Sequence, residues 1–229
     1  MTEDLGCITI PLVPGRREPG DKSEMITQLL FGEIYEVLEL QKKWVLVRSA
    51  SDQYESWIDR KQHTPIDKKP NFNQTIRAAF TPISSGHQMW FIPAGSKVNL
   101  GTFSIGSKTF SFDGSNDQAK AEPIRYANQL IGAPYLWGGK SIFGIDCSGL
   151  VQVVYSCCGI QLPRDAYQQA EIGKTVDFVE TAKPGDLAYF DNEEGRITHV
   201  GIMLDGERII HASGSVRVDR IDHEGIYNS

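Results

Sequence analysis

The spacing of apolar residues changes once along this chain of 229 residues, and that change limits the fold more than any other feature. Up to about residue 113, apolar and polar residues alternate in short runs such as EIYEVLEL and KKWVLVRS, which is typical of strands. Beyond the polar stretch FDGSND, apolar residues recur at a helical spacing from Ile124 to Ile131, and Gly132 ends the pattern. The sequence therefore predicts an all-β region followed by an α+β region in which helices come first.

Three segments follow from this pattern. Residues 1–75 hold four alternating runs, which is the rhythm of a small β-barrel, and they end in the polar stretch HTPIDKKPNFNQT, a linker or surface excursion. Residues 76–113 contain further strand-like runs, and the pattern leaves open whether they extend the first barrel or form a degenerate second one. Residues 114–229 make up the α+β region, whose strands are predicted at DLAYFD, THVGIMLD and RIIHASG.

Composition and charge narrow the class of partner. The net charge of -6 and the absence of a basic block argue against a surface for nucleic acid or anionic membrane. Acidic residues stand near the first methionine and no apolar run reaches roughly 18 residues, so we expect a cytoplasmic protein with small soluble partners. The four cysteines have no metal-ligand spacing, so we expect reduced thiols and neither metal nor cofactor.

One cysteine stands where chemistry is favoured. Cys147 opens a predicted helix that Asp146 or Ser148 can cap. The partial positive charge at a helix N-terminus lowers a thiol pKa and favours the nucleophilic thiolate. Backbone amides at the same end, including that of Cys147, can stabilise an oxyanion. The alternative for a lone cysteine is a small buried apolar residue.

Two histidines supply the base that this cysteine lacks locally. His199 and His211 each lie in an apolar strand, and the turn Asp205-Gly206-Glu207 between the strands predicts a hairpin. The two side chains then fall nearly opposite one another. One imidazole can take the thiol proton while the other orients it, which points to acyl transfer or amide hydrolysis. Each histidine alone is as well explained by a satisfied position in the core.

Six motifs carry a resemblance to a known family. PYLWGG, DCSGLVQ, LPRDAYQQA, KPGDLAYF, ITHVGIML and IIHASG resemble, in order and spacing, the NlpC/P60 family of cysteine peptidases, which cleave bacterial cell-wall peptides. The resemblance implies a papain-like domain with helices packed on an antiparallel sheet. It also implies that Cys147 is the nucleophile, His199 the general base and His211 the third, orienting residue. Tyr135 of PYLWGG matches a tyrosine near the nucleophile that can aid the oxyanion.

The first region adds a second resemblance. LLFGEIYEVLE and WVLVRSASDQYESWIDR resemble a bacterial SH3-like domain, and the pairing resembles γ-D-glutamyl-L-diamino acid endopeptidases, which recycle murein peptides. That subgroup requires a free N-terminal L-alanine on its substrate. The resemblance implies that Glu33, Tyr54 and Asp146 hold the substrate ammonium group, since a buried cation needs carboxylates to offset its desolvation.

Two further residues of the motifs are assigned to substrate binding. Arg164 of LPRDAYQQA can meet a substrate carboxylate with both ends of its guanidinium, and Ser148 lies beside the nucleophile. Ala166 departs from the family pattern, because many relatives have serine there, and this puts the substrate-side hydrogen bonds in doubt. For Glu33, Tyr54 and Arg164 the alternative is an ordinary surface or packing residue.

The expectation is thus a cysteine endopeptidase whose partner is a small murein peptide. One alternative is an extracellular hydrolase that remodels intact wall and uses the barrel to bind it. A second is a non-enzymatic SH3-like binding protein. A transferase with the same acyl-enzyme is a third, because only the acceptor differs. The accepted diamino acid and the oligomeric state stay open.

Overall fold

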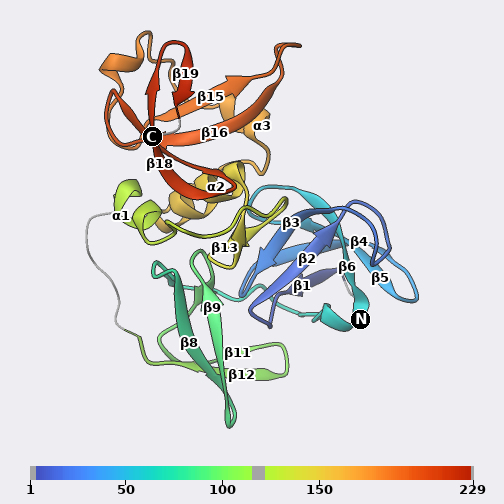
Figure 1. The fold of residues 1–229 in the computed structure, drawn as a ribbon. Coiled ribbons are helices and arrows are strands. Elements are labelled where there is room, and N and C mark those ends of the chain that lie inside the picture. The colour runs from blue at the N-terminus through green and yellow to red at the C-terminus, as the bar shows by residue number, and fades with distance from the viewer. Residues whose placement is uncertain (1–3, 115–121, 228–229) are drawn as a thin grey trace. The chain divides into compact units, whose positions relative to one another are not determined.

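The computed structural model describes residues 4–114 and 122–227. The chain separates into two compact units that divide between residues 119 and 120, called here unit 1 and unit 2, and each is described by itself (Figure 1). The last three residues of the polar stretch FDGSND and the four that follow them lie outside the described residues. Among the residues that are described, no helix combines the length and the apolar character needed to cross a membrane.

The first part of unit 1 is the expected small barrel. Its six-stranded sheet has the order β1-β4-β5-β6-β2-β3. Alternate residues of the strands, such as Val45 and Val47, point into a buried cluster with Tyr35 and Ile58, as the period of two requires. The strands are β1 (Leu5–Cys7), β2 (Leu12–Arg16), β3 (Met25–Leu30), β4 (Ile34–Leu40), β5 (Trp44–Ser49) and β6 (Glu55–Asp59), followed by the 3-10 helix η1 (Arg60–Gln62).

Residues 76–113 form a second antiparallel sheet with the order β11-β12-β8-β9. Its inward face shares one buried cluster with the barrel region, in which the ring of Phe31 meets that of Phe110 edge-on at 4.9 Å between centroids. Ile66 is 7% exposed and joins the same cluster, so the polar stretch that we expected to be a linker or surface excursion is anchored at this residue, while residues 67–69 are exposed. The strands of this sheet are β8 (Phe80–Ser85), β9 (Gln88–Pro93), β11 (Gly101–Ile105) and β12 (Lys108–Phe112), and β7 (Gln74–Thr75) pairs with β10 (Lys97–Val98) in a separate two-stranded sheet.

Unit 2 has helices first and an antiparallel sheet after them, as expected. Helix α2 packs against α1 and against the sheet strands β16 and β17 (Figure 1). The five-stranded sheet is a simple meander in the order β15-β16-β17-β18-β19. The helices are α1 (Pro123–Asn128), α2 (Cys147–Cys157), α3 (Ala166–Ala170) and the 3-10 helix η2 (Val179–Thr181). The strands are β13 (Lys140–Ser141), β14 (Gly144–Ile145), β15 (Leu187–Asp191), β16 (Ile197–Met203), β17 (Arg208–Ser213), β18 (Ser215–Asp222) and β19 (Gly225–Tyr227).

Candidate active site

The start of α2 is shaped by the residues on either side of Cys147. Of the two candidate caps, Asp146 takes the role: its Oδ1 accepts a hydrogen bond from the amide of Gly149 at 2.6 Å, which satisfies one of the amides that a helix start leaves unpaired. A Cβ at Gly149 would lie 2.3 Å from the carbonyl oxygen of Gly139. Only glycine therefore lets α2 begin this close to the preceding loop.

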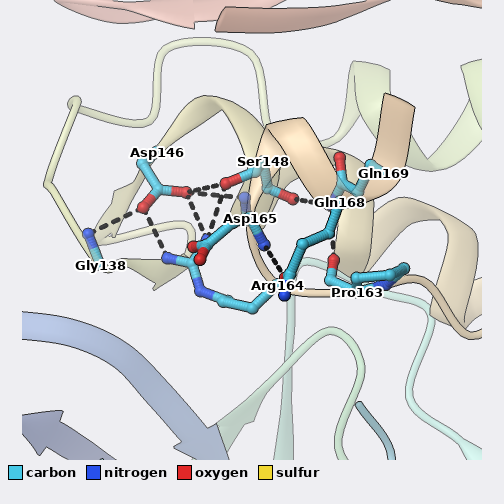
Figure 2. Close-up of polar contacts among 9 residues, drawn as sticks. Gly138, Asp146, Ser148, Pro163, Arg164, Asp165, Gln168 and Gln169 are labelled. Atoms are coloured by element: carbon cyan, nitrogen blue, oxygen red, sulfur yellow. Dashed lines mark hydrogen bonds and ion pairs between the residues drawn. The ribbon is translucent and has the colours of Figure 1, made fainter. Parts of the chain in front are cut away.

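A buried ion pair holds the capping carboxylate (Figure 2). Arg164 is 1% exposed, and its Nη1 and Nη2 donate to Oδ1 and Oδ2 of Asp146 at 3.1 Å and 2.5 Å. Nη1 also donates to the hydroxyl of Ser148 at 2.8 Å, and the amide of Gly138 donates to Asp146 at 2.8 Å. The guanidinium thus holds Asp146 and Ser148, the two residues that flank Cys147, in place.

This cluster bears on the expected substrate contacts. The carboxylate of Asp146 is paired with the guanidinium of Arg164 inside the protein, and its role toward a substrate ammonium group stays a prediction. The carboxylate that Arg164 meets is likewise inside the protein. The roles of Arg164 and Ser148 toward a substrate carboxylate stay predictions.

The LPRDAYQQA motif ties this cluster to the rest of unit 2. Gln169 is 1% exposed and its Nε2 donates to the carbonyl oxygens of Ser148 and Pro163 at 3.1 Å and 2.8 Å (Figure 2). Asp165 caps the short helix α3, which begins at Ala166. Ala166, the position that departs from the family pattern, is 7% exposed. The motif therefore has a packing role as well as the binding role that we expected of it.

The sulfur of Cys147 is buried beside strand β16. The side chain is in a residue only 5% exposed, and the backbone amides of Val200 and Ser148 hydrogen-bond to the thiol. Burial, and after it the negative charge of Asp146, raises the pKa of Cys147 in spite of these amides. The pKa thus shifts opposite to the lowering that we expected at the helix N-terminus, because desolvation and the charge of Asp146 outweigh the hydrogen bonds from the amides and the charge of Arg164. This thiol needs a base.

The two predicted histidines form a direct pair. Nε2 of His199 lies 2.8 Å from Nδ1 of His211, with the rings edge to face at 83°. The residue opposite His211 in the β16–β17 ladder is Gly201, two positions beyond His199. A Cβ at Gly201 would lie 3.0 Å from that of His211, so the missing side chain leaves the ring of His211 space to lean toward His199.

The electrostatics of the pair suit a base. Burial, followed by the charge of His211, lowers the pKa of His199 to about 4. His199 is thus neutral at neutral pH and able to accept a proton. Its backbone is joined directly to the amide of Val200 that bonds the sulfur of Cys147, so the thiol lies beside the strand segment that carries the base.

Tyr135 also belongs to this environment. Its amide donates to the carbonyl of Gly214 at 2.9 Å, which fixes its backbone to the turn between β17 and β18. Burial, then the charges of Cys147 and Asp146, raises the pKa of Tyr135 to about 12. The phenol therefore keeps its proton at neutral pH and can donate a hydrogen bond next to the sulfur.

Sequence reasoning missed the residues behind His211. Nε2 of His211 lies 2.9 Å from Oδ2 of Asp219, which is 5% exposed and also accepts from Nε of Arg217 at 2.8 Å. The signal was present in the alternation of Val and charged residues in SVRVD, which predicts a strand with both charges on one face. We had not assigned β18 as a strand.

Glu33 and Tyr54 lie in unit 1, in two neighbouring turns. Glu33 closes the turn between β3 and β4 by donating its amide to the carbonyl of Leu30. Tyr54 precedes β6, and the amide of Ala50 donates to the carbonyl of Ile34 at 2.9 Å, which holds the two turns together. Because Cys147 belongs to unit 2, their role toward a substrate stays a prediction.

A thiol, a neutral imidazole and an orienting partner are the parts needed for acyl transfer. Cys147, His199 and His211 are the candidates for these three parts. Within residues 4–114 and 122–227, no group of three or more His, Cys, Asp or Glu side chains is arranged to hold a metal ion. The expectation of metal-independent chemistry stays a prediction.

Both units contain a segment that matches a known protein family. The model of the NlpC/P60 family matches residues 132–229, and that of the bacterial dipeptidyl-peptidase Sh3 domain matches residues 15–62. A γ-D-glutamyl-L-lysine dipeptidyl-peptidase of Bacillus subtilis strain 168 is 32% identical over 213 residues, which is 81% of this chain and 71% of the relative. A γ-DL-glutamyl hydrolase of the same strain is 40% identical over 121 residues, 52% of this chain and 28% of the relative.

A solved structure agrees with the fold. The crystal structure of an NlpC/P60 family protein from Bacillus cereus ATCC 10987 has a TM-score of 0.79 at 20% identity and covers 94% of both chains. The expected architecture, an SH3-like barrel followed by helices on an antiparallel sheet, is confirmed.

Proposed function

The chain belongs to the NlpC/P60 family of peptidases, and we propose that it is a thiol hydrolase of murein peptides. The bond cut joins the side-chain carboxyl of D-glutamate to a diamino acid in peptides with a free N-terminal L-alanine. The relative that matches most of the chain carries γ-D-glutamyl-L-lysine in its name, and the second also acts on γ-glutamyl bonds. The observation that carries the proposal is the 2.8 Å pairing of His199 with His211, because His199 directly precedes Val200, whose amide bonds the sulfur of Cys147.

The first half of the reaction forms an acyl-enzyme. Nδ1 of His199 takes the proton of the Cys147 thiol, and the sulfur attacks the γ-carbonyl carbon of the D-glutamyl residue. The carbonyl electrons move onto oxygen and return when the C–N bond breaks. The imidazolium of His199 then gives its proton to the leaving amine of the diamino acid, which leaves a thioester on Cys147.

The second half releases the acid. Water attacks the thioester carbonyl while His199 accepts a proton from it. The C–S bond breaks, the sulfur takes the proton back from His199, and the γ-glutamyl carboxylic acid leaves and loses its remaining proton to water. His211 keeps the ring of His199 in place through both halves and stabilises its positive charge.

The oxyanion that forms twice needs donors close to the sulfur. The amide of Gly149 is bonded to Oδ1 of Asp146 and that of Leu150 to the carbonyl of Asp146. We assign the oxyanion to the amide of Cys147 together with the phenol of Tyr135. Each such donor is worth about 10²–10³ in kcat.

The substrate contacts belong to the same proposal. Glu33 and Tyr54, held in neighbouring turns of the barrel, and Asp146 are the residues proposed to receive the N-terminal ammonium group. Ser148 and the guanidinium of Arg164 behind it receive a substrate carboxylate. A requirement for a free L-alanine suits peptides already released from the glycan, and a cytoplasmic site of action belongs to this proposal.

A panel of tripeptides tests the reaction. We expect mass analysis to show release of the diamino acid from L-alanyl-γ-D-glutamyl-diamino acid, and no release by the Cys147→Ala variant. An N-acetylated tripeptide should be cut far more slowly than the free amine. Equal cleavage of both would remove the ammonium pocket from the proposal, and cleavage of neither would remove the substrate.

Three controls separate the alternatives. Release of peptides from intact sacculi at a comparable rate would favour a wall-remodelling hydrolase. A mixed product on addition of an amine acceptor would reveal a transferase. Equal iodoacetamide labelling of Cys147 and the three other cysteines would favour a binding protein with ordinary thiols. We expect activity to be lost on alkylation and unchanged by a chelator.

A further inference from the structure

A continuous row of polar side chains runs behind the proposed base. It passes from His199 on β16 to His211 on β17 and on to Asp219 on β18, through contacts of 2.8 Å and 2.9 Å. His211 and Asp219 are 3% and 5% exposed. Hydrogen bonds between such buried groups are strong and costly to leave unmade. The row ends at Arg217, whose Nε donates to the same oxygen of Asp219 that faces His211.

The ladder between β17 and β18 explains why these groups meet. Arg217 lies directly opposite His211, and Asp219 lies opposite Ile209, so Asp219 is the diagonal neighbour of His211 on the same face. The hydrogen bond from His211 and the bond and charge of Arg217 outweigh burial, which would raise the pKa of Asp219, and hold it below its usual range. Asp219 is thus an anion and can only accept hydrogen bonds.

The charge of Asp219 therefore determines which ring nitrogens of His211 and His199 carry a hydrogen. An anionic Asp219 requires Nε2 of His211 to carry a hydrogen, so in the neutral ring Nδ1 of His211 has a lone pair. That lone pair faces Nε2 of His199, which must then carry the hydrogen. The remaining nitrogen of His199, Nδ1, is left with its lone pair and is the only basic atom of the ring.

We propose that Asp219 is a positioning residue, which selects the tautomer of His211 and through it makes Nδ1 of His199 the base. Arg217 serves Asp219 by fixing the oxygen that His211 meets. This rests on the proposed function, since it assigns a nitrogen to the proposed proton transfer. The groups facing the imidazole pair are Asp219 and Arg217 from β18 and the apolar ring of Phe190 from β15.

The test reads the thiol and the rings without a substrate. In the full chain, the rate of iodoacetamide labelling of Cys147 is measured against pH by peptide mass analysis, with Cys158 as an internal reference. For Asp219→Ala we expect labelling of Cys147 at neutral pH to slow by about 10- to 100-fold. The loss should be smaller than the roughly 10⁴-fold effect of altering a carboxylate that touches the base directly.

Asp219→Asn and Asp219→Glu are the companion variants. The Asn side chain keeps an oxygen that Arg217 can hold toward His211, so we expect a smaller loss. Adding Arg217→Gln frees the amide to turn its NH₂ toward His211, and the loss should then approach that of Asp219→Ala. Asp219→Glu should restore part of the rate. Asp222→Asn removes a carboxylate from the same strand, bonded to Tyr227 instead of the histidines, and should change nothing.

Nitrogen chemical shifts of the rings give the decisive signature. In the unaltered protein we expect His199 as the Nε2–H tautomer, and in Asp219→Ala a mixture of both tautomers. Unchanged tautomers and an unchanged labelling profile in every Asp219 variant that folds would overturn the inference. Because neither readout uses a peptide, failure to cleave murein tripeptides would reject the proposed function and leave this result standing.

Discussion

Replacing Arg164 by methionine should destabilise the start of α2. The variant keeps much of the side-chain volume but leaves the carboxylate of Asp146, in a residue 4% exposed, without its cation. Removing one partner of a buried ion pair costs about 3–5 kcal/mol. Asp146 keeps its bonds from the amides of Gly138 and Gly149, so we expect a loss near the lower end, about 3 kcal/mol.

Native-state hydrogen exchange at the amides of α2 measures this loss in unit 2 alone. A loss of about 3 kcal/mol corresponds to amide exchange on the order of 100-fold faster. In a thermal scan it corresponds to an unfolding midpoint roughly 10–20 °C lower. Adding Asp146→Asn to Arg164→Met gives a double variant in which the unpaired negative charge is removed. The double variant should therefore lose less stability than the sum of the two single variants.

The matched control is an exposed Arg–Asp pair of unit 2. Arg208 contacts Asp205 at 2.6 Å, but the two side chains are 60% and 40% exposed, and solvent screens such pairs. We expect Arg208→Met to leave the exchange of α2 unchanged. If Arg164→Met and Arg208→Met behave alike, burial does not set the strength of the Arg164–Asp146 pair and the reasoning fails.

Three further predictions concern the catalytic groups. Because the pKa of His199 is lowered to about 4, its neutral form persists as the pH falls, and kcat/KM should decline only as the pH drops through that value; a midpoint near 6.5 would contradict this. Gly201→Ala puts a methyl 3.0 Å from the Cβ of His211 and should lower kcat and cost about 1–3 kcal/mol of stability; Gly20→Ala, where a Cβ meets nothing within 4 Å, is the control. Tyr135→Phe keeps the ring but removes the phenol proton, so kcat should fall about tenfold or more with little change in KM, and an unchanged kcat would remove Tyr135 from the oxyanion site.

The local pattern of the sequence predicted the parts of the site that depend on one element at a time. The capping of α2 by Asp146 and the placement of His199 and His211 on a hairpin follow from short-range rules. The motif resemblance added the order in which these parts act. Both kinds of inference used residues whose neighbours in space are near in sequence or on paired strands.

What the sequence did not predict depends on burial and on partners distant in the chain. The pKa of Cys147 is raised because desolvation and the charge of Asp146 outweigh the hydrogen bonds from the amides, and burial is not visible in a string of residues. The pairing of Asp146 with Arg164 was not predicted because the two residues lie 18 positions apart. Asp219 went unnoticed because β18 had not been recognised, and without that strand its distance to His211 has no meaning.

The apolar cluster shared by Phe31 and Phe110 has a practical consequence for anyone who wishes to transplant the barrel. A fragment cut near residue 75 would strip away Ile83, Ile92 and Phe110 and uncover the aromatic underside of the first sheet. Such a fragment should aggregate or misfold, whereas a fragment extended through Phe112 keeps the second sheet that covers this apolar face. Domain-swap chimaeras between relatives should therefore be joined beyond Phe112, so that both sheets come from the same protein.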